Sequence, residues 1–133
     1  MKNLLKLEEL AQFLICLGCM IVLKAPWWCY LLLLLGPDIG MLGYLASPLA
    51  GAFTYNMLHH KGVAIMIIMI GGYMTTGILF SDGSWTGIVL LLAGIILYGH
   101  ASLDRIFGYG LKFGDNFHHT HLGWIGKGVA SSE

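Results

Sequence analysis

The chain has 133 residues, of which 57% are hydrophobic and only 11% are charged. Soluble domains carry about 25% charged residues, so the composition excludes an ordinary soluble enzyme, and the length leaves no room for a second domain. Seven basic residues balance seven acidic ones, which gives no net charge to attract nucleic acid. The sequence therefore predicts a single all-α integral membrane domain over residues 1–133.

Long apolar stretches predict the membrane-spanning helices, because a helix needs about 20 apolar residues to cross the hydrocarbon core. Four transmembrane helices are expected, at residues 7–23, 26–45, 63–80 and 85–107. Within the second, Pro37 stands directly before Asp38. Proline should kink this helix or loosen its hydrogen bonds.

A shorter helix is predicted between the second and third spans, at residues 48–60. Ser47 suits its N-cap and Pro48 its first position. The segment is too short to cross a bilayer, so we expect an interfacial or re-entrant helix. Residues 108–133 are rich in glycine and histidine and are expected to form a polar tail.

The basic residues predict the orientation. If the N-terminus is cytoplasmic, six of the seven basic residues are cytoplasmic: Lys2, Lys6, Lys61, Arg105, Lys112 and Lys127. Only Lys24 falls outside, where its long side chain can reach the headgroups. Three tryptophans, Trp27, Trp28 and Trp85, would then lie at the outer interface. Both signals favour four spans with both termini in the cytoplasm.

Ionisable residues within the spans are candidate functional residues, because burying them in hydrocarbon is costly. Asp38 and His100 each lie about seven residues before the cytoplasmic end of their helix. At 1.5 Å per residue both are roughly 10 Å below the cytoplasmic surface. An isolated carboxylate at this depth would have to protonate or find a partner, so we expect the two side chains to meet.

Histidines and carboxylates on the cytoplasmic side predict a metal site. His100 and Asp104 are four residues apart, and Asn56 and His59 three apart, so each pair shares a helix face. All six histidines fall in the cytoplasmic half: His59, His60, His100, His118, His119 and His121. Histidine and carboxylate together bind zinc or non-haem iron. The predicted ligands are His59, His100, His121 and Asp38, with Asp104 as an alternative carboxylate ligand.

Simpler interpretations of the same residues stay open. His100 and Asp104 could form only a helix-stabilising pair, and the tail histidines could be solvated and bind nothing. Cys16 and Cys19 have helical spacing but are read as small apolar residues of a membrane helix. With three cysteines the chain shows no disulfide framework.

Two segments resemble a family of small bacterial membrane proteins that is catalogued only as a domain of unknown function. The first runs from Gly36-Pro37-Asp38 to Tyr44 and continues over Tyr55–His59, and the second covers Gly99–Lys112 and then Thr120-His121-Leu122-Gly123. The resemblance implies a four-helix protein of the bacterial inner membrane and supplies no activity.

A looser likeness exists to membrane-bound metal-dependent hydrolases. In those proteins a Pro-Asp pair within a helix and a Thr-His segment are thought to meet at a metal, and Pro37-Asp38 and Thr120-His121 match this pattern. The second aspartate expected after Pro-Asp is Gly40 here, which disfavours a site with two metals.

The leading functional hypothesis is a hydrolase with one metal, zinc rather than iron, open to the cytoplasmic face. Asp104 or Asp38 would relay the proton of a metal-bound water, and Arg105 and Asn56 would bind a lipid or another amphiphilic small molecule. A small proton- or ion-coupled transporter or channel that uses Asp38 and His100 is the first alternative. A non-catalytic subunit with a structural metal is the second. Membrane lipids are expected partners, and a homo-oligomer stays open.

Overall fold

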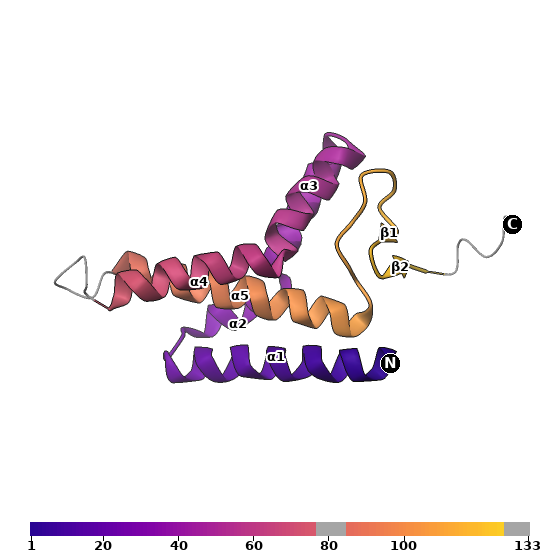
Figure 1. Ribbon diagram of the computed structural model, residues 1–133. Helices are drawn as coiled ribbons and strands as arrows, with labels where there is room; N and C mark the ends of the chain where they lie inside the picture. The colour runs from indigo at the N-terminus through magenta and orange to yellow at the C-terminus, as the bar shows by residue number, and fades with distance from the viewer. Residues whose placement is uncertain (77–84, 127–133) are drawn as a thin grey trace, which may run out of the picture.

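The computed structural model describes residues 1–76 and 85–126. These residues form five α-helices, a 3-10 helix and two short strands (Figure 1). Their bounds are α1 Lys2–Val22, α2 Trp27–Leu35, η1 Gly36–Leu45, α3 Pro48–His59, α4 Lys61–Thr75, α5 Trp85–Phe107, β1 His119–Thr120 and β2 Gly123–Trp124. The end of the span expected at 63–80 and the last part of the tail lie outside the described residues.

Helix α5 is the centre of the fold and packs against α1, α2 and α4. Figure 1 shows α1 antiparallel to α5, so the N-terminal end of α1 lies beside the C-terminal end of α5. The buried core joins α1, α2 and α5 through Met20, Cys29, Leu33 and Ile95. The polar ends of α1 and α5 are therefore brought to the same end of the bundle.

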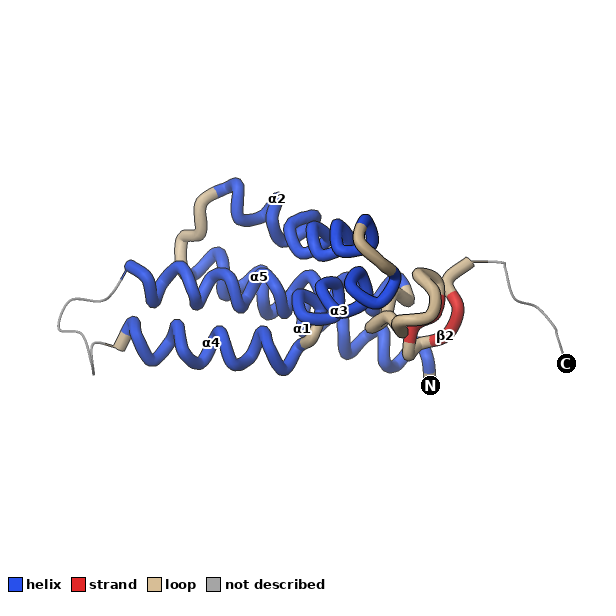
Figure 2. Tube along the Cα trace, turned by 90° about the horizontal axis from the view of Figure 1, so that it is seen from above, coloured by secondary structure: helices blue, strands red, loops and turns tan. Residues whose placement is uncertain are grey.

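Glycines allow α4 and α5 to pack with their backbones in close contact, and the two helices run side by side in Figures 1 and 2. A Cβ atom added at Gly71 would lie 2.3 Å from the backbone nitrogen of Leu91. One added at Gly94 would lie 2.8 Å from the backbone nitrogen of Ile68. Small residues at these positions permit the close helix contact that is common in membrane proteins.

The second predicted span is continuous in the chain but changes its helix type. Helix α2 ends at Leu35, and η1 continues as a 3-10 helix from Gly36 to Leu45 with Pro37 in its first turn. Proline has no backbone N–H and clashes with the preceding turn, so an α-helix cannot continue undisturbed through it. The predicted disturbance at Pro37 is therefore present, and it places Asp38 at the start of η1.

The predicted short helix is present as α3, which packs against η1. Ser47 caps it, since its Oγ accepts a hydrogen bond of 3.1 Å from the backbone nitrogen of Ala50. Thr54 Oγ1 joins the two helices by donating to the carbonyl oxygen of Gly40 at 2.6 Å. Figure 1 shows α3 projecting from the bundle, and its outward side chains include Leu49 and Phe53.

Two helices are long and apolar enough to cross a membrane: Trp27–Leu45, which combines α2 and η1, and Trp85–Phe107, which is α5. The pair α3 and α4, bent by 47°, makes a third if it forms one span. Helix α1 is not among these candidates, and its first half carries Lys2, Lys6, Glu8 and Glu9. The described residues thus contain two to three candidate spans.

Candidate metal centre

Four side chains from three helices converge beside the middle of the bundle. Asp38 comes from the start of η1, His59 from the last residue of α3, and His100 and Asp104 from one face of α5. Each offers a ligand atom, and all four atoms lie within 4.8 Å of one another. The expected meeting of Asp38 with His100, and the shared face of His100 and Asp104, are both observed.

Both histidines are held in one tautomer by backbone carbonyls. His59 Nδ1 lies 2.8 Å from the carbonyl oxygen of Tyr55, and His100 Nδ1 lies 2.9 Å from that of Leu33. A carbonyl oxygen can only accept, so each Nδ1 carries a proton and donates it, and in the neutral imidazole each Nε2 then presents a lone pair. Metal-binding histidines are usually oriented in this way.

The two Nε2 atoms are buried and have no hydrogen-bond partner among the described residues. His59 is 3% exposed and His100 is 1% exposed, so water does not readily satisfy these nitrogens. An unpaired buried lone pair costs about 1–3 kcal/mol. Two such atoms beside two carboxylates are therefore unfavourable in the neutral imidazoles unless a metal ion or a proton binds there.

The distances within the cluster suit a metal better than direct hydrogen bonds. His59 Nε2 lies 3.7 Å from Asp38 Oδ1 and 3.3 Å from Asp104 Oδ2. His100 Nε2 lies 3.4 Å from Asp38 Oδ1 and 3.7 Å from Asp104 Oδ1. Nitrogen–oxygen hydrogen bonds are about 2.7–3.2 Å long. Ligand atoms about 2.0–2.2 Å from a tetrahedral metal are separated by roughly 3.3–3.6 Å, which is close to these four nitrogen–oxygen distances. The set of one ligand atom per residue spans up to 4.8 Å, so it would have to contract around an ion.

Tyr55 contacts two members of the cluster and holds them in place. Its hydroxyl donates a hydrogen bond of 2.8 Å to Asp104 Oδ2, and its ring stacks on the His59 ring with centroids 3.7 Å apart. This role of Tyr55 was not predicted from the sequence. The available signal was its position four residues before His59, which places both side chains on one face of α3.

The cluster has a closed side formed by the tail and a more open side at Asp38. The Asp104 side chain is 17% exposed, whereas that of Asp38 is 37% exposed. The recess next to Asp104 that Arg105 and tail residues 109–111 line is too small to hold a water molecule. The cluster is therefore more accessible from the Asp38 side than from the side of the tail.

The tail is fastened across α3 by Asn56. Its Nδ2 donates to the carbonyl oxygen of Lys112 at 2.8 Å, and its Oδ1 accepts from the backbone nitrogen of Lys112 at 2.7 Å. Asn56 was expected to bind substrate, but both ends of its amide are occupied by this backbone. Arg105, the other expected substrate-binding residue, borders the recess, and its Nη1 lies 3.6 Å from Glu9 Oε1.

Lys112 brings a positive charge close to the two carboxylates. Its side chain is 5% exposed, and its Nζ donates to the carbonyl oxygen of Phe117 at 2.9 Å and lies 4.9 Å from the centre of the Tyr55 ring. Burial lowers the pKa of Lys112, and the negative charges of Asp104 and Asp38 oppose this effect. The cation partly offsets the negative charge of the cluster.

The tail histidines lie outside the cluster. His121, a predicted ligand, uses its Nδ1 to accept a hydrogen bond of 2.8 Å from the backbone nitrogen of Leu111. His119 Nδ1 is 2.7 Å from Asp115 Oδ2, and this contact lowers the pKa of Asp115. Of the four predicted ligands, the structure thus brings together Asp38, His59 and His100, with Asp104 in the place expected for His121.

Comparisons with known proteins identify the family of this chain but assign it no activity. No curated protein matches the chain. No solved structure matches it either. Residues 2–125 match the family described as "Domain of unknown function (DUF4260)", which includes every residue of the cluster and of the tail that covers it. The chain therefore belongs to the DUF4260 family.

Proposed function

We propose that this protein is a membrane-embedded hydrolase that uses one metal ion, zinc, and acts on an amphiphilic substrate. The observation that carries the proposal is the pair of buried Nε2 lone pairs of His59 and His100, which face two carboxylates without a hydrogen-bond partner. A donor set of two histidine nitrogens and carboxylate oxygens suits zinc. Iron accepts the same ligand types and is the second choice.

The three ligands in this proposal are His59, His100 and Asp38. A single oxygen of Asp38 approaches both histidine nitrogens, as expected of a ligand that binds through one atom. A zinc ion held by these three residues would supply a Lewis acid that makes water more acidic. Asp104 accepts the proton of the attacking water, and Tyr55 holds its carboxylate in place by the hydrogen bond to Oδ2.

The substrate class follows from the surroundings of the cluster. Arg105 borders the recess beside Asp104, and a guanidinium group binds phosphate or carboxylate well. Apolar side chains of the η1–α3 pair, which supplies Asp38 and His59, are exposed, including Ile39, Leu42 and Phe53. An anionic headgroup with an apolar chain matches both features.

The proposed placement is the bacterial inner membrane, with four spans and both termini in the cytoplasm. The excess of basic residues at one end of the bundle supports this orientation. Helix α1 would serve as the first span despite its charged first half, α2 with η1 would form the second, and α3 would be the interfacial or re-entrant helix. The cluster then opens towards the cytoplasmic face, where lipid headgroups are available.

A structural metal site in a non-catalytic subunit is the second candidate, and one distance favours it. Asp104 Oδ2 lies 3.3 Å from His59 Nε2, so Asp104 is close enough to be a fourth protein ligand. Four protein ligands leave no position for water, as in structural zinc sites. The catalytic proposal instead requires a free position beside Asp104.

Asp104→Asn separates the two candidates. The purified protein in nanodiscs would be given zinc and assayed with a chromogenic decanoyl ester and a chromogenic phosphodiester. If Asp104 is the proton acceptor, the variant keeps its zinc and loses hydrolysis by about 10²–10⁴-fold. Loss of zinc in this variant, with no hydrolysis by wild type, would favour the structural site. Asp115→Asn, a tail carboxylate outside the cluster, is the matched control.

A further inference from the structure

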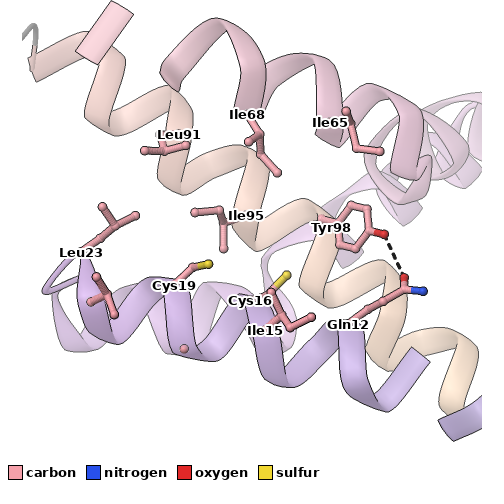
Figure 3. Close-up of a pocket in the computed structure, with 12 residues that line it drawn as sticks. Gln12, Ile15, Cys16, Cys19, Leu23, Ile65, Ile68, Leu91, Ile95 and Tyr98 are labelled. Atoms are coloured by element: carbon pink, nitrogen blue, oxygen red, sulfur yellow. Dashed lines mark hydrogen bonds between the residues drawn. The ribbon is translucent and has the colours of Figure 1, made fainter. Parts of the chain in front are cut away.

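The apolar groove between α1, α4 and α5 does not reach the metal cluster (Figure 3). None of the residues that line the groove belongs to the cluster. In Figure 3 the Tyr98 hydroxyl meets Gln12 there, and it donates a hydrogen bond of 2.9 Å to Gln12 Oε1. The Asp104 side of the cluster is covered by the tail instead, so the attachment of the tail decides whether this side can open.

The tail is held together by hydrogen bonds of its own. His121 Nδ1 accepts from the backbone nitrogen of Leu111 at 2.8 Å, and the His121 backbone nitrogen donates to the carbonyl oxygen of Leu111 at 3.0 Å. The backbone nitrogen of Phe113 donates to the carbonyl oxygen of His119 at 2.9 Å. The tail leaves α5 at Gly108, whose φ of 92° is a conformation that glycine adopts readily. It can therefore move as one unit about the end of α5.

Few contacts fasten this unit to the helices. Apart from the turn that ends α5, the hydrogen bonds from the tail to the helices are, among the described residues, those that Asn56 makes with the backbone of Lys112. The Lys112 side chain adds its ammonium group, which lies 3.4 Å from the centre of the Phe117 ring and 4.9 Å from that of the Tyr55 ring. Phe117 packs edge-on against Tyr44 of η1, with ring centres 5.1 Å apart. Lys112 is thus central to the attachment.

The buried charge of Lys112 depends on the cluster. Tyr55 links the two, since its ring contacts the ammonium group and its hydroxyl donates to Asp104 Oδ2 at 2.8 Å. Lys112 is 5% exposed, and burying an ammonium group is costly unless negative charge lies nearby. Burial lowers the pKa of Lys112, and the negative charges of Asp104 and Asp38 oppose this effect. The docked tail is therefore stabilised by two carboxylates whose charge a bound metal ion would neutralise.

We propose that the tail is a cover over the Asp104 side of the cluster and that binding of a divalent metal ion releases it. A divalent ion at the cluster cancels the charge of the two carboxylates and repels the ammonium group of Lys112, which is then more stable in water. Coupling between two binding events is reciprocal, so the docked tail in turn weakens metal binding. Release opens the narrow space beside Asp104 and Arg105 to an anionic headgroup. The inference rests on the metal site of the proposed function but not on hydrolysis.

Amide hydrogen exchange of the tail tests this proposal, in nanodiscs at constant pH with and without one equivalent of zinc. Zinc should speed exchange of the Lys112 amide about tenfold in wild type. Lys112→Met keeps the side-chain length and the backbone bonds to Asn56 but has no charge, so zinc should leave its tail exchange unchanged. By reciprocity it should bind zinc about tenfold more tightly. Lys6→Met, which changes an exposed lysine of α1, is the matched control and should respond as wild type does.

Asp38→Asn tests the charge in the absence of metal. Asp38 Oδ1 lies 3.4 Å from His100 Nε2 and 3.7 Å from His59 Nε2, beyond hydrogen-bond distance, so the variant removes a negative charge and no hydrogen bond. Its metal-free tail should exchange faster than that of metal-free wild type, and equal rates would overturn the proposal. Circular dichroism checks that each variant folds.

A dye titration of zinc separates this inference from the proposed function. If wild type binds no zinc, the metal site itself is refuted, whereas zinc that binds without speeding tail exchange overturns only the cover. An equal zinc response in wild type and Lys112→Met would also overturn it, since zinc would then act on the tail directly, through histidines such as His119. Zinc that binds and releases the tail without any hydrolysis would leave the cover standing and refute the hydrolase.

Discussion

Replacing Tyr55 by phenylalanine tests how the cluster is oriented. The change removes the 2.8 Å hydrogen bond to Asp104 Oδ2 and keeps the ring that stacks on His59. A hydrogen bond to a charged acceptor is worth about 1.5–3 kcal/mol. Asp104 is the proton acceptor in the proposed mechanism and not a ligand, so this loss should act on hydrolysis while the zinc stays bound. At about 1.4 kcal/mol per tenfold, we expect hydrolysis to slow by roughly 10–150-fold with zinc affinity unchanged.

The assay is the rate of ester hydrolysis in nanodiscs, with a competition titration against a zinc-binding dye to measure zinc affinity. Tyr44→Phe is the matched control, because the Tyr44 hydroxyl is buried and makes no hydrogen bond among the described residues. The control should keep the rate and the zinc affinity of wild type. An unchanged rate in Tyr55→Phe would refute the reasoning, since Asp104 would then accept the proton without help from Tyr55.

Two further predictions concern the scaffold around the site. Gly71→Ala should destabilise the α4–α5 contact by about 1–3 kcal/mol, because the added methyl would lie 2.3 Å from the backbone nitrogen of Leu91. The measurement is the unfolding midpoint in detergent. The control Gly72→Ala should leave that midpoint unchanged, because a Cβ atom there meets nothing within 4 Å. Equal midpoints would contradict this packing. Asn56→Ala should release the tail at Lys112 and so speed amide hydrogen exchange in the tail. Unaltered exchange would show that the two hydrogen bonds of the Asn56 side chain do not hold the tail in place.

The sequence predicted much of the cluster because its spacing is local or follows from helix geometry. His100 and Asp104 share a face by their separation of four residues, and Asp38 meets His100 because both lie at a similar depth. His121 could not be placed in this way. The tail has no helical period, and its path depends on the two hydrogen bonds that Asn56 makes with Lys112.

The fold was predictable where apolar length alone determines an element. The expected helix at 85–107 is α5 with the same bounds, and Ser47 caps α3 as predicted. The pairing of η1 with α3 was not predictable, because it depends on the contact between Thr54 and Gly40. Tyr55 was missed for a related reason, since its partner Asp104 lies on a different helix.

The most direct test of a metal centre is the metal content of the protein purified in detergent, measured by mass spectrometry with His59→Ala and His100→Ala alongside. The account predicts about one zinc ion per chain in wild type and none in either variant, with membrane insertion intact. His119→Ala, which changes a tail histidine outside the cluster, should keep its zinc. A wild type that binds no metal when zinc is supplied, or a full zinc content in His100→Ala, would contradict the central claim.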